Sequence, residues 1–286
     1  MQYLQILLVI LLFCIISYIG IKISIHKENL QNSEIRENYN NQLVENFVSE
    51  LKADSDIHYL YWTGGFDSTY RLCEMLVNEG KTVQPIYVSL VLDNDCQSEE
   101  SCNKLWLRRN RKEERLAMKK IKDLLNNKFP YTKKTLLPVL EVDQPINDDL
   151  FNHSFEKKFY SDNLWPRKRR KHQYLFLSKY AYYHKKRVDI GVLGIHEGSK
   201  FAQFLKQNLV KENNNYVVPI TGHAISYLNF PLYGRSKEQL LEQSKQGLYD
   251  EILKESWSCW FPRNGKPCGK CPMCRERIVE HPKNDV

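Results

Sequence analysis

Short apolar runs alternate with longer amphipathic segments along most of the chain. The apolar runs predict β-strands over residues 57–63, 83–92, 135–142, 188–195 and 224–228. Apolar residues at helical spacing predict α-helices over residues 68–79, 109–126, 170–186, 198–209 and 236–246. Strands that alternate with helices are typical of an α/β fold. We therefore expect a doubly wound, mostly parallel sheet with a ligand site at the carboxyl ends of its strands.

The N-terminal end of the chain has a different pattern. Residues 3–21 are almost wholly apolar, and a run of about 19 such residues can cross a bilayer as a helix. A cleaved signal peptide is the alternative, but no basic residue precedes the run and no A-x-A site follows it. Since Lys22 and Arg36 follow the run, the positive-inside rule places the globular part in the cytosol. The pattern predicts a single-pass membrane protein, with a transmembrane helix in residues 1–25 and a polar tether in residues 26–55.

Composition and charge narrow the expected partners. The 286 residues are 42% hydrophobic and 12% aromatic, which suffices for one sizeable α/β domain and an appendage. The net charge of +8 favours anionic partners. The strongest basic tract covers residues 167–172 and includes Arg167 and Arg170. Such a tract can neutralise nucleotide phosphates or bind nucleic acid, and the alternative is a solvated helix start.

A glycine-containing turn follows the first predicted strand. The turn and the start of the next helix, which we call the glycine loop, comprise Thr63, Gly64, Gly65, Phe66, Asp67, Ser68 and Thr69. Glycines let the backbone approach a ligand closely, and a helix N-terminus directs backbone N–H groups at an anion. Asp67 would repel phosphates unless a cation intervenes, which predicts Mg²⁺ shared between Asp67 and the phosphates. The alternative is an ordinary glycine turn in which Asp67 caps the helix.

Four cysteines gather near the C-terminus, in what we call the cysteine segment (residues 257–278). They are Cys259, Cys268, Cys271 and Cys274. Three of them have C-x-x-C-x-x-C spacing, and four thiols in so short a span are typical of a tetrahedral zinc site. Two disulfides or an iron–sulfur cluster are the alternatives, but in ferredoxins the fourth cysteine follows the other three closely. Here it lies upstream, so we expect a structural zinc ion around which the segment folds.

Both of these segments resemble one enzyme superfamily. The glycine loop resembles the S-G-G-x-D-S motif of PP-loop ATP pyrophosphatases, with Thr63 in place of the first serine. The cysteine segment, W-S-C…C-G-x-C-x-x-C-x-x-R up to Arg277, is similar to that of the 7-cyano-7-deazaguanine synthase family, which makes a queuosine precursor. Residues 230–238, with F-P-L and S-K-E, and residues 176–183, with F-L-S and A-x-Y, are similar to further family segments. The chain departs from the family at residues 194–199, where the family has an aspartate and a Y-P-D-C-R segment linked to substrate recognition.

The resemblance implies an adenine nucleotide alpha-hydrolase-like domain over residues 56–256, followed by a zinc knuckle. It implies an ATP-dependent ligase that adenylates a carboxylate, releases pyrophosphate and transfers the acyl group to ammonia. Asp67 and Lys237 are implied as catalytic residues, and ATP contacts are implied for the glycine loop, Arg167 and Arg170. In the family the acid is 7-carboxy-7-deazaguanine, and the cofactors implied are ATP, Mg²⁺ and Zn²⁺.

Two other functions stay open on the sequence. A tRNA base-modifying PP-loop enzyme of the thiolase type would use the same adenylation on a base carbonyl, and the basic tract favours it. A membrane-tethered descendant without catalysis would keep the nucleotide pocket as a binding module. Nucleic acid is therefore a partner that the sequence allows without favouring it. Members of the family often form homodimers, but the sequence predicts no interface.

Overall fold

The computed structural model describes residues 57–91, 109–145, 173–194, 200–212, 215–219, 225–271, 273–275 and 277. All of them belong to one compact unit, Leu51–Val286. The predicted transmembrane helix and polar tether lie outside the described residues, as do Arg167, Arg170 and residues 195–199. Within the described part of the chain, no helix is long and apolar enough to span a bilayer.

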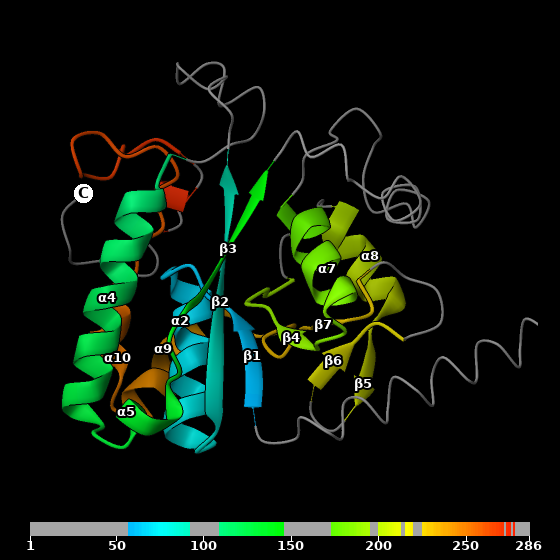
Figure 1. The fold of residues 1–286 in the computed structure, drawn as a ribbon, viewed down its shortest axis with the longest axis horizontal. Helices are drawn as coiled ribbons and strands as arrows, with labels where there is room; N and C mark the ends of the chain where they lie inside the picture. Colours follow the sequence, from blue (N-terminus) through cyan, green and yellow to red (C-terminus); the bar gives the residue numbers. More distant parts are fainter. Residues whose placement is uncertain are drawn as a thin grey trace, which may run out of the picture. The chain divides into compact units, whose positions relative to one another are not determined.

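A seven-stranded sheet organises the described residues (Figure 1). Its strands are β1 (Ile57–Tyr61), β2 (Thr82–Val91), β3 (Leu140–Pro145), β4 (Val188–Asp189), β5 (Val210–Glu212), β6 (Asn215–Val217) and β7 (Leu228–Asn229). They lie in the order β3-β2-β1-β4-β7-β6-β5. Every pairing from β3 across to β7 is parallel, whereas β6 pairs antiparallel with both β5 and β7. The predicted mostly parallel sheet is confirmed.

Helices pack on both faces of this sheet. They are α2 (Phe66–Cys73), continued by the π-helical turn η1 (Glu74–Asn78), and α4 (Arg111–Lys128), α5 (Thr132–Thr135), α7 (Gln173–Tyr183), α8 (Lys200–Asn208), α9 (Lys237–Gln246) and α10 (Asp250–Leu253). Successive residues of a strand point to opposite faces of a sheet. Leu60 in β1 accordingly packs with α2, α4 and α10, whereas Tyr61 packs with α7 and α8. The α/β architecture predicted from the alternation of strands and helices is therefore present.

Four segments differ from the prediction. The strand β4 covers only the first two residues of the segment predicted over residues 188–195. The helix α5 occupies the start of the third predicted strand, because the Thr132 hydroxyl donates to the Phe129 carbonyl at 2.8 Å and favours a turn there. The strand β7 begins only at the last residue of the segment predicted over residues 224–228. The hairpin of β5 and β6 was not predicted, since all residues of β5 are exposed and show no apolar alternation.

The strand order places the end of β1 at a change of direction in the sheet. From β1 the chain proceeds through β2 to β3 on one side, and it then returns to β4 on the other side of β1. In open α/β sheets, ligands bind beyond the carboxyl ends of two strands related in this way. The glycine loop follows β1, and residues 190–194 follow β4, so both segments lie at this edge.

Candidate functional site

Trp62 anchors the chain directly before the glycine loop. This residue is fully buried, and its backbone N–H donates to the Ile86 carbonyl at 3.0 Å. Its indole Nε1 donates to Thr69 Oγ1 at 3.1 Å, and Thr69 is itself fully buried. The Phe66 side chain is buried as well. Phe66 can therefore offer a ligand only its backbone. The Thr69 side chain is buried beneath the loop, where it accepts the hydrogen bond from Trp62.

Gly64 gives the loop its close contact with α4. Its φ angle is +69°, a left-handed conformation that side chains disfavour. A Cβ atom added here would lie 3.1 Å from the Glu114 carbonyl oxygen and 3.1 Å from Met118 Cγ. Both the backbone conformation and the approach of α4 therefore favour glycine at this position.

The first turn of α2 forms the open end of the glycine loop. Its N-cap residue is Gly65, which has no side chain to cap the helix. The Ser68 hydroxyl donates to the Gly65 carbonyl at 3.2 Å, and Asp67 lies in the first turn. The alternative that Asp67 is the helix cap is wrong, because Gly65 occupies that position. A helix N-terminus without a side-chain cap presents backbone N–H groups that can bind an anion.

The segment after β4 closes onto the start of α2. A Cβ atom added to Gly191 would lie 2.8 Å from the Ser68 backbone nitrogen and 2.9 Å from the Asp67 carbonyl carbon. Only a residue without a side chain permits this approach. Sequence reasoning did not place Gly191 at the site. Its only signal was a glycine within the strand predicted over residues 188–195.

The fold also brings Lys237 to the glycine loop. Lys237 is the first residue of α9, and its Nζ lies 5.7 Å from the centroid of the Phe66 ring. Ser236 caps this helix, since its side chain accepts the Gln239 N–H at 3.2 Å and the Gln239 side chain accepts the Ser236 N–H at 2.8 Å. This capping box fixes the start of α9 and therefore the backbone of Lys237.

The four predicted metal ligands form one cluster. The Sγ atoms of Cys259, Cys268, Cys271 and Cys274 all lie within 4.8 Å of one another. The Sγ atoms of Cys268 and Cys274 are 3.9 Å apart, and all four cysteines are free thiols. Tetrahedral zinc with Zn–S bonds of about 2.3 Å separates its sulfur ligands by roughly 3.8 Å. The donor set and its spacing therefore fit zinc, and the two-disulfide alternative is wrong.

Backbone N–H groups also point at the sulfur atoms of this cluster. The Cys268 N–H donates to Cys259 Sγ at 3.2 Å, and the Cys271 N–H donates to Cys268 Sγ at 3.4 Å. Burial raises the pKa of the Cys268 thiol, but hydrogen bonds from the backbone of Lys270 and Cys271 and from the side chains of Cys259 and Cys271 outweigh it and lower this pKa to about 7. Backbone donors of this kind stabilise thiolates, the form in which cysteine binds a metal ion.

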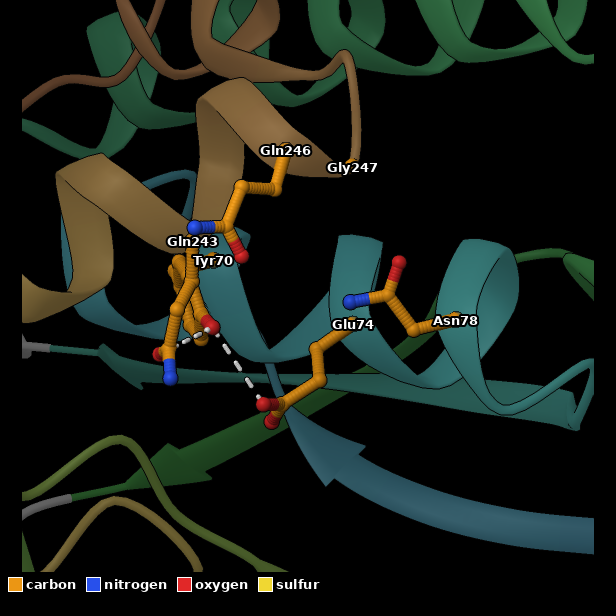
Figure 2. A pocket seen from close by; sticks show the side chains of 6 residues that line it. All are labelled: Tyr70, Glu74, Asn78, Gln243, Gln246 and Gly247. Atoms are coloured by element: carbon orange, nitrogen blue, oxygen red, sulfur yellow. Dashed lines mark hydrogen bonds between the residues drawn. The ribbon is translucent and has the colours of Figure 1, made fainter.

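A separate pocket lies between α9 and the helix formed by α2 and η1 (Figure 2). It has a volume of about 370 Å³ and is lined by Tyr70, Glu74, Asn78, Gln243, Gln246 and Gly247. The Tyr70 hydroxyl lies 3.3 Å from a Glu74 carboxylate oxygen and 3.1 Å from the Gln243 side-chain oxygen. Arg235 forms an ion pair with Glu74 at 2.8 Å. The pocket contains none of the predicted site residues and its main polar groups pair with one another, so the glycine loop remains the candidate site.

One comparison with known proteins bears on this site. Residues 178–283 match the model of the family described as queuosine biosynthesis protein QueC. This segment is just over a third of the chain and includes β4, Lys237 and the four cysteines, but it does not include the glycine loop. No curated protein matches the chain. The match supports a QueC-like, ATP-using PP-loop relationship for the C-terminal part.

Proposed function

We propose that this protein is an ATP-dependent ligase that adenylates a carboxylate and transfers the acyl group to ammonia. The observation that carries the proposal is the arrangement at the end of β1. There the uncapped start of α2, the closely approaching Gly191 and the cation of Lys237 come together. The QueC family match over residues 178–283, which includes Gly191 and Lys237 but not the start of α2, supports the same class of enzyme.

In this proposal the glycine loop binds the β- and γ-phosphates of ATP. The backbone N–H groups at the start of α2 and the Ser68 hydroxyl face the leaving pyrophosphate, where the helix dipole favours negative charge. Asp67 and the phosphates together would hold Mg²⁺, which neutralises phosphate charge when bound. Lys237, with Arg167 and Arg170 from the basic tract, stabilises the charge that builds on the leaving group.

The reaction then proceeds in two transfers. A carboxylate oxygen of the substrate attacks the α-phosphorus, the bond to the β-phosphate oxygen breaks, and pyrophosphate leaves. Ammonia attacks the acyl-adenylate carbon, AMP leaves, and the nitrogen loses a proton to give the amide. The substrate suggested by the resemblance is 7-carboxy-7-deazaguanine, for which a second activation removes water and gives a nitrile. No protein side chain acts as a covalent nucleophile in this scheme.

The remaining parts of the proposal concern location and metal. Cys259, Cys268, Cys271 and Cys274 hold a zinc ion with a structural role, as their mutual distances suggest. The apolar run of residues 3–21 anchors the protein in a membrane, and the globular part lies in the cytosol. A cytosolic location agrees with a supply of ATP and with reduced thiols.

A tRNA base-modifying enzyme is the second candidate, and one observation favours it. An open pocket at the start of α4 has a volume of about 760 Å³. It is lined by five cationic residues and one leucine, namely Arg109, Arg111, Lys112, Arg115, Lys119 and Leu116. A surface of this charge suits a nucleic-acid backbone. Pyrophosphate release that depends on tRNA, and not on a small carboxylic acid, would favour this candidate over the ligase.

Pyrophosphate release by the full-length protein in detergent tests the proposed reaction. The assay contains Mg-ATP and ammonium, with and without 7-carboxy-7-deazaguanine, and products are identified by mass spectrometry. We expect acid-dependent release with an amide or nitrile product. The variant Asp67→Asn should lower the rate of pyrophosphate release by about 10²–10³-fold, because the site loses the negative charge that binds the cation.

The matched control is Asp123→Asn. Asp123 is an exposed carboxylate on α4, so this variant should leave the rate unchanged. An active Asp67→Asn protein would contradict the proposal.

A further inference from the structure

The cysteine segment touches the glycine loop directly. The backbone N–H of Trp257 donates to the Gly64 carbonyl at 2.8 Å. A Cβ atom added to Gly65 would lie 3.6 Å from the Trp257 carbonyl oxygen. The Trp257 peptide therefore runs alongside the two glycines whose conformation defines the loop.

The side chain of Trp257 joins the same residue to the cysteine cluster. Its indole Nε1 donates to the Cys259 carbonyl at 2.8 Å. The ring packs against the core formed by β1, α2 and α4, and also against the cluster of Cys259, Cys271 and Cys274. Among the partly buried apolar residues of the described chain, Trp257 alone packs against both groups. It is therefore a direct physical connection between the metal ligands and the loop.

Two further hydrogen bonds hold this connection in place. Arg277 Nη1 donates to the Ser256 carbonyl at 2.8 Å, directly before Trp257. The Arg109 N–H donates to the Trp260 carbonyl at 2.9 Å, which ties the cysteine segment to the start of α4. Since α4 also contacts Gly64, the loop has contacts with both α4 and the cysteine segment.

We propose that the metal-loaded cysteine cluster sets the conformation of the glycine loop, with Trp257 as the positioning residue, so that occupancy of the cluster controls nucleotide affinity. A bound ion cross-links four side chains and orders a segment that has little regular secondary structure of its own. An ordered segment holds the Trp257 N–H against Gly64, so nucleotide binding meets a loop that is already in its binding conformation. Without the ion, nucleotide binding must order both segments. The statement about affinity rests on the proposed function, whereas the statement about loop conformation does not.

Hydrogen exchange of the full-length protein without nucleotide tests the coupling. Zinc-loaded protein is compared with protein treated with a chelator, and zinc release is measured in the same samples. We expect backbone amides of the glycine loop to exchange at least about five-fold faster after zinc release, the effect of losing roughly one hydrogen bond. Amides of α8, which packs in the other core, should be unchanged. Zinc release with unchanged exchange in the loop would overturn the proposal.

Two matched tryptophan variants test the route of the coupling and keep the zinc ligands intact. Trp257→Phe removes the indole donor to Cys259, whereas Trp260→Phe makes the same chemical change three residues away on the same segment. Both variants should retain zinc. Only Trp257→Phe should raise exchange in the glycine loop, by about five-fold, and weaken ATP binding by a similar factor. Equal effects in the two variants, or no effect in Trp257→Phe, would rule out Trp257 as the positioning residue.

The combined outcomes separate this inference from the proposed function. If the protein does not bind ATP but exchange in the loop depends on zinc, the proposed function fails and the coupling stands. If ATP binds with equal affinity to zinc-loaded and zinc-free protein, the control of nucleotide affinity by zinc fails and nucleotide binding stands.

Discussion

The glycine loop and the cysteine cluster are both short motifs, but the fold builds them in different ways. All four cysteines come from one stretch of the chain, and the backbone donors to their sulfur atoms belong to that stretch. The glycine loop is surrounded by segments from four other places, which contribute Met118, Gly191, Lys237 and Trp257. The cluster is thus a local structure that a metal ion can order, whereas the loop depends on tertiary packing. Substitutions should reveal this difference.

The largest effect is expected from a change within the cysteine cluster. Cys271→Ser should abolish stoichiometric zinc binding and lower the free energy of unfolding of the cysteine segment by at least about 3 kcal/mol. Circular dichroism of the sheet should change little, because the cluster forms a hydrophobic group separate from the two main cores. Metal analysis and thermal unfolding measure both effects. Cys73→Ala, at a buried cysteine outside the cluster, is the control and should retain zinc.

The next effect concerns the contact between the segment after β4 and the glycine loop. In Gly191→Ala the added methyl group would meet the backbone at Asp67 and Ser68, so one of the two segments must move. We expect a loss of about 1–3 kcal/mol in unfolding free energy and a loss of ATP binding, with zinc content unchanged. Chemical denaturation and calorimetric titration with ATP provide the two readouts. Unchanged ATP affinity in this variant would show that the loop does not depend on the approach of the segment after β4.

A pair of glycine variants separates backbone strain from steric contact in the loop. Gly64 and Gly80 both have positive φ angles, +69° and +62°, but only Gly64 has neighbours within 4 Å of an added Cβ atom. Alanine at either position should lower the free energy of unfolding by about 1–2 kcal/mol, because its side chain disfavours a positive φ angle. Gly64→Ala should lower the free energy of unfolding more than Gly80→Ala does, because α4 must also move. Of the two variants, only Gly64→Ala should weaken ATP binding. Equal losses in denaturant unfolding would mean that α4 accommodates the methyl group.

The smallest effect is expected at the cap that positions Lys237. Ser236→Ala removes one side-chain acceptor from the start of α9 and should cost about 1 kcal/mol in stability. Pyrophosphate release should fall modestly, since Lys237 keeps its charge but loses part of its support. Ser236→Asp restores an acceptor and should recover both stability and rate. Failure of this rescue would indicate that the Ser236 hydroxyl acts in some way other than capping.

Sequence reasoning located the parts of the site that are written as local patterns. The glycines after an apolar strand, the carboxylate of Asp67 and the cysteine spacing each occupy a few consecutive positions, so they can be recognised without a fold. It did not identify Gly191 or Trp257 as neighbours of the loop, because their contacts join residues far apart in the chain. It also missed the hairpin of β5 and β6, whose short exposed strands lack the apolar alternation on which such predictions depend.

The sequence by itself determined the alternation of strands and helices, a loop suited to phosphates and a cluster of thiols suited to zinc. These features depend on residue type and on spacing over a few consecutive positions, so each can be recognised from its own segment of the sequence. Only the tertiary structure decided that Gly191 and Lys237 meet the loop and that the Trp257 peptide lies against Gly64. The reason is physical. Strand order and helix packing determine which distant segments touch. Both depend on the burial of apolar residues over the whole sheet, and no single motif contains that information.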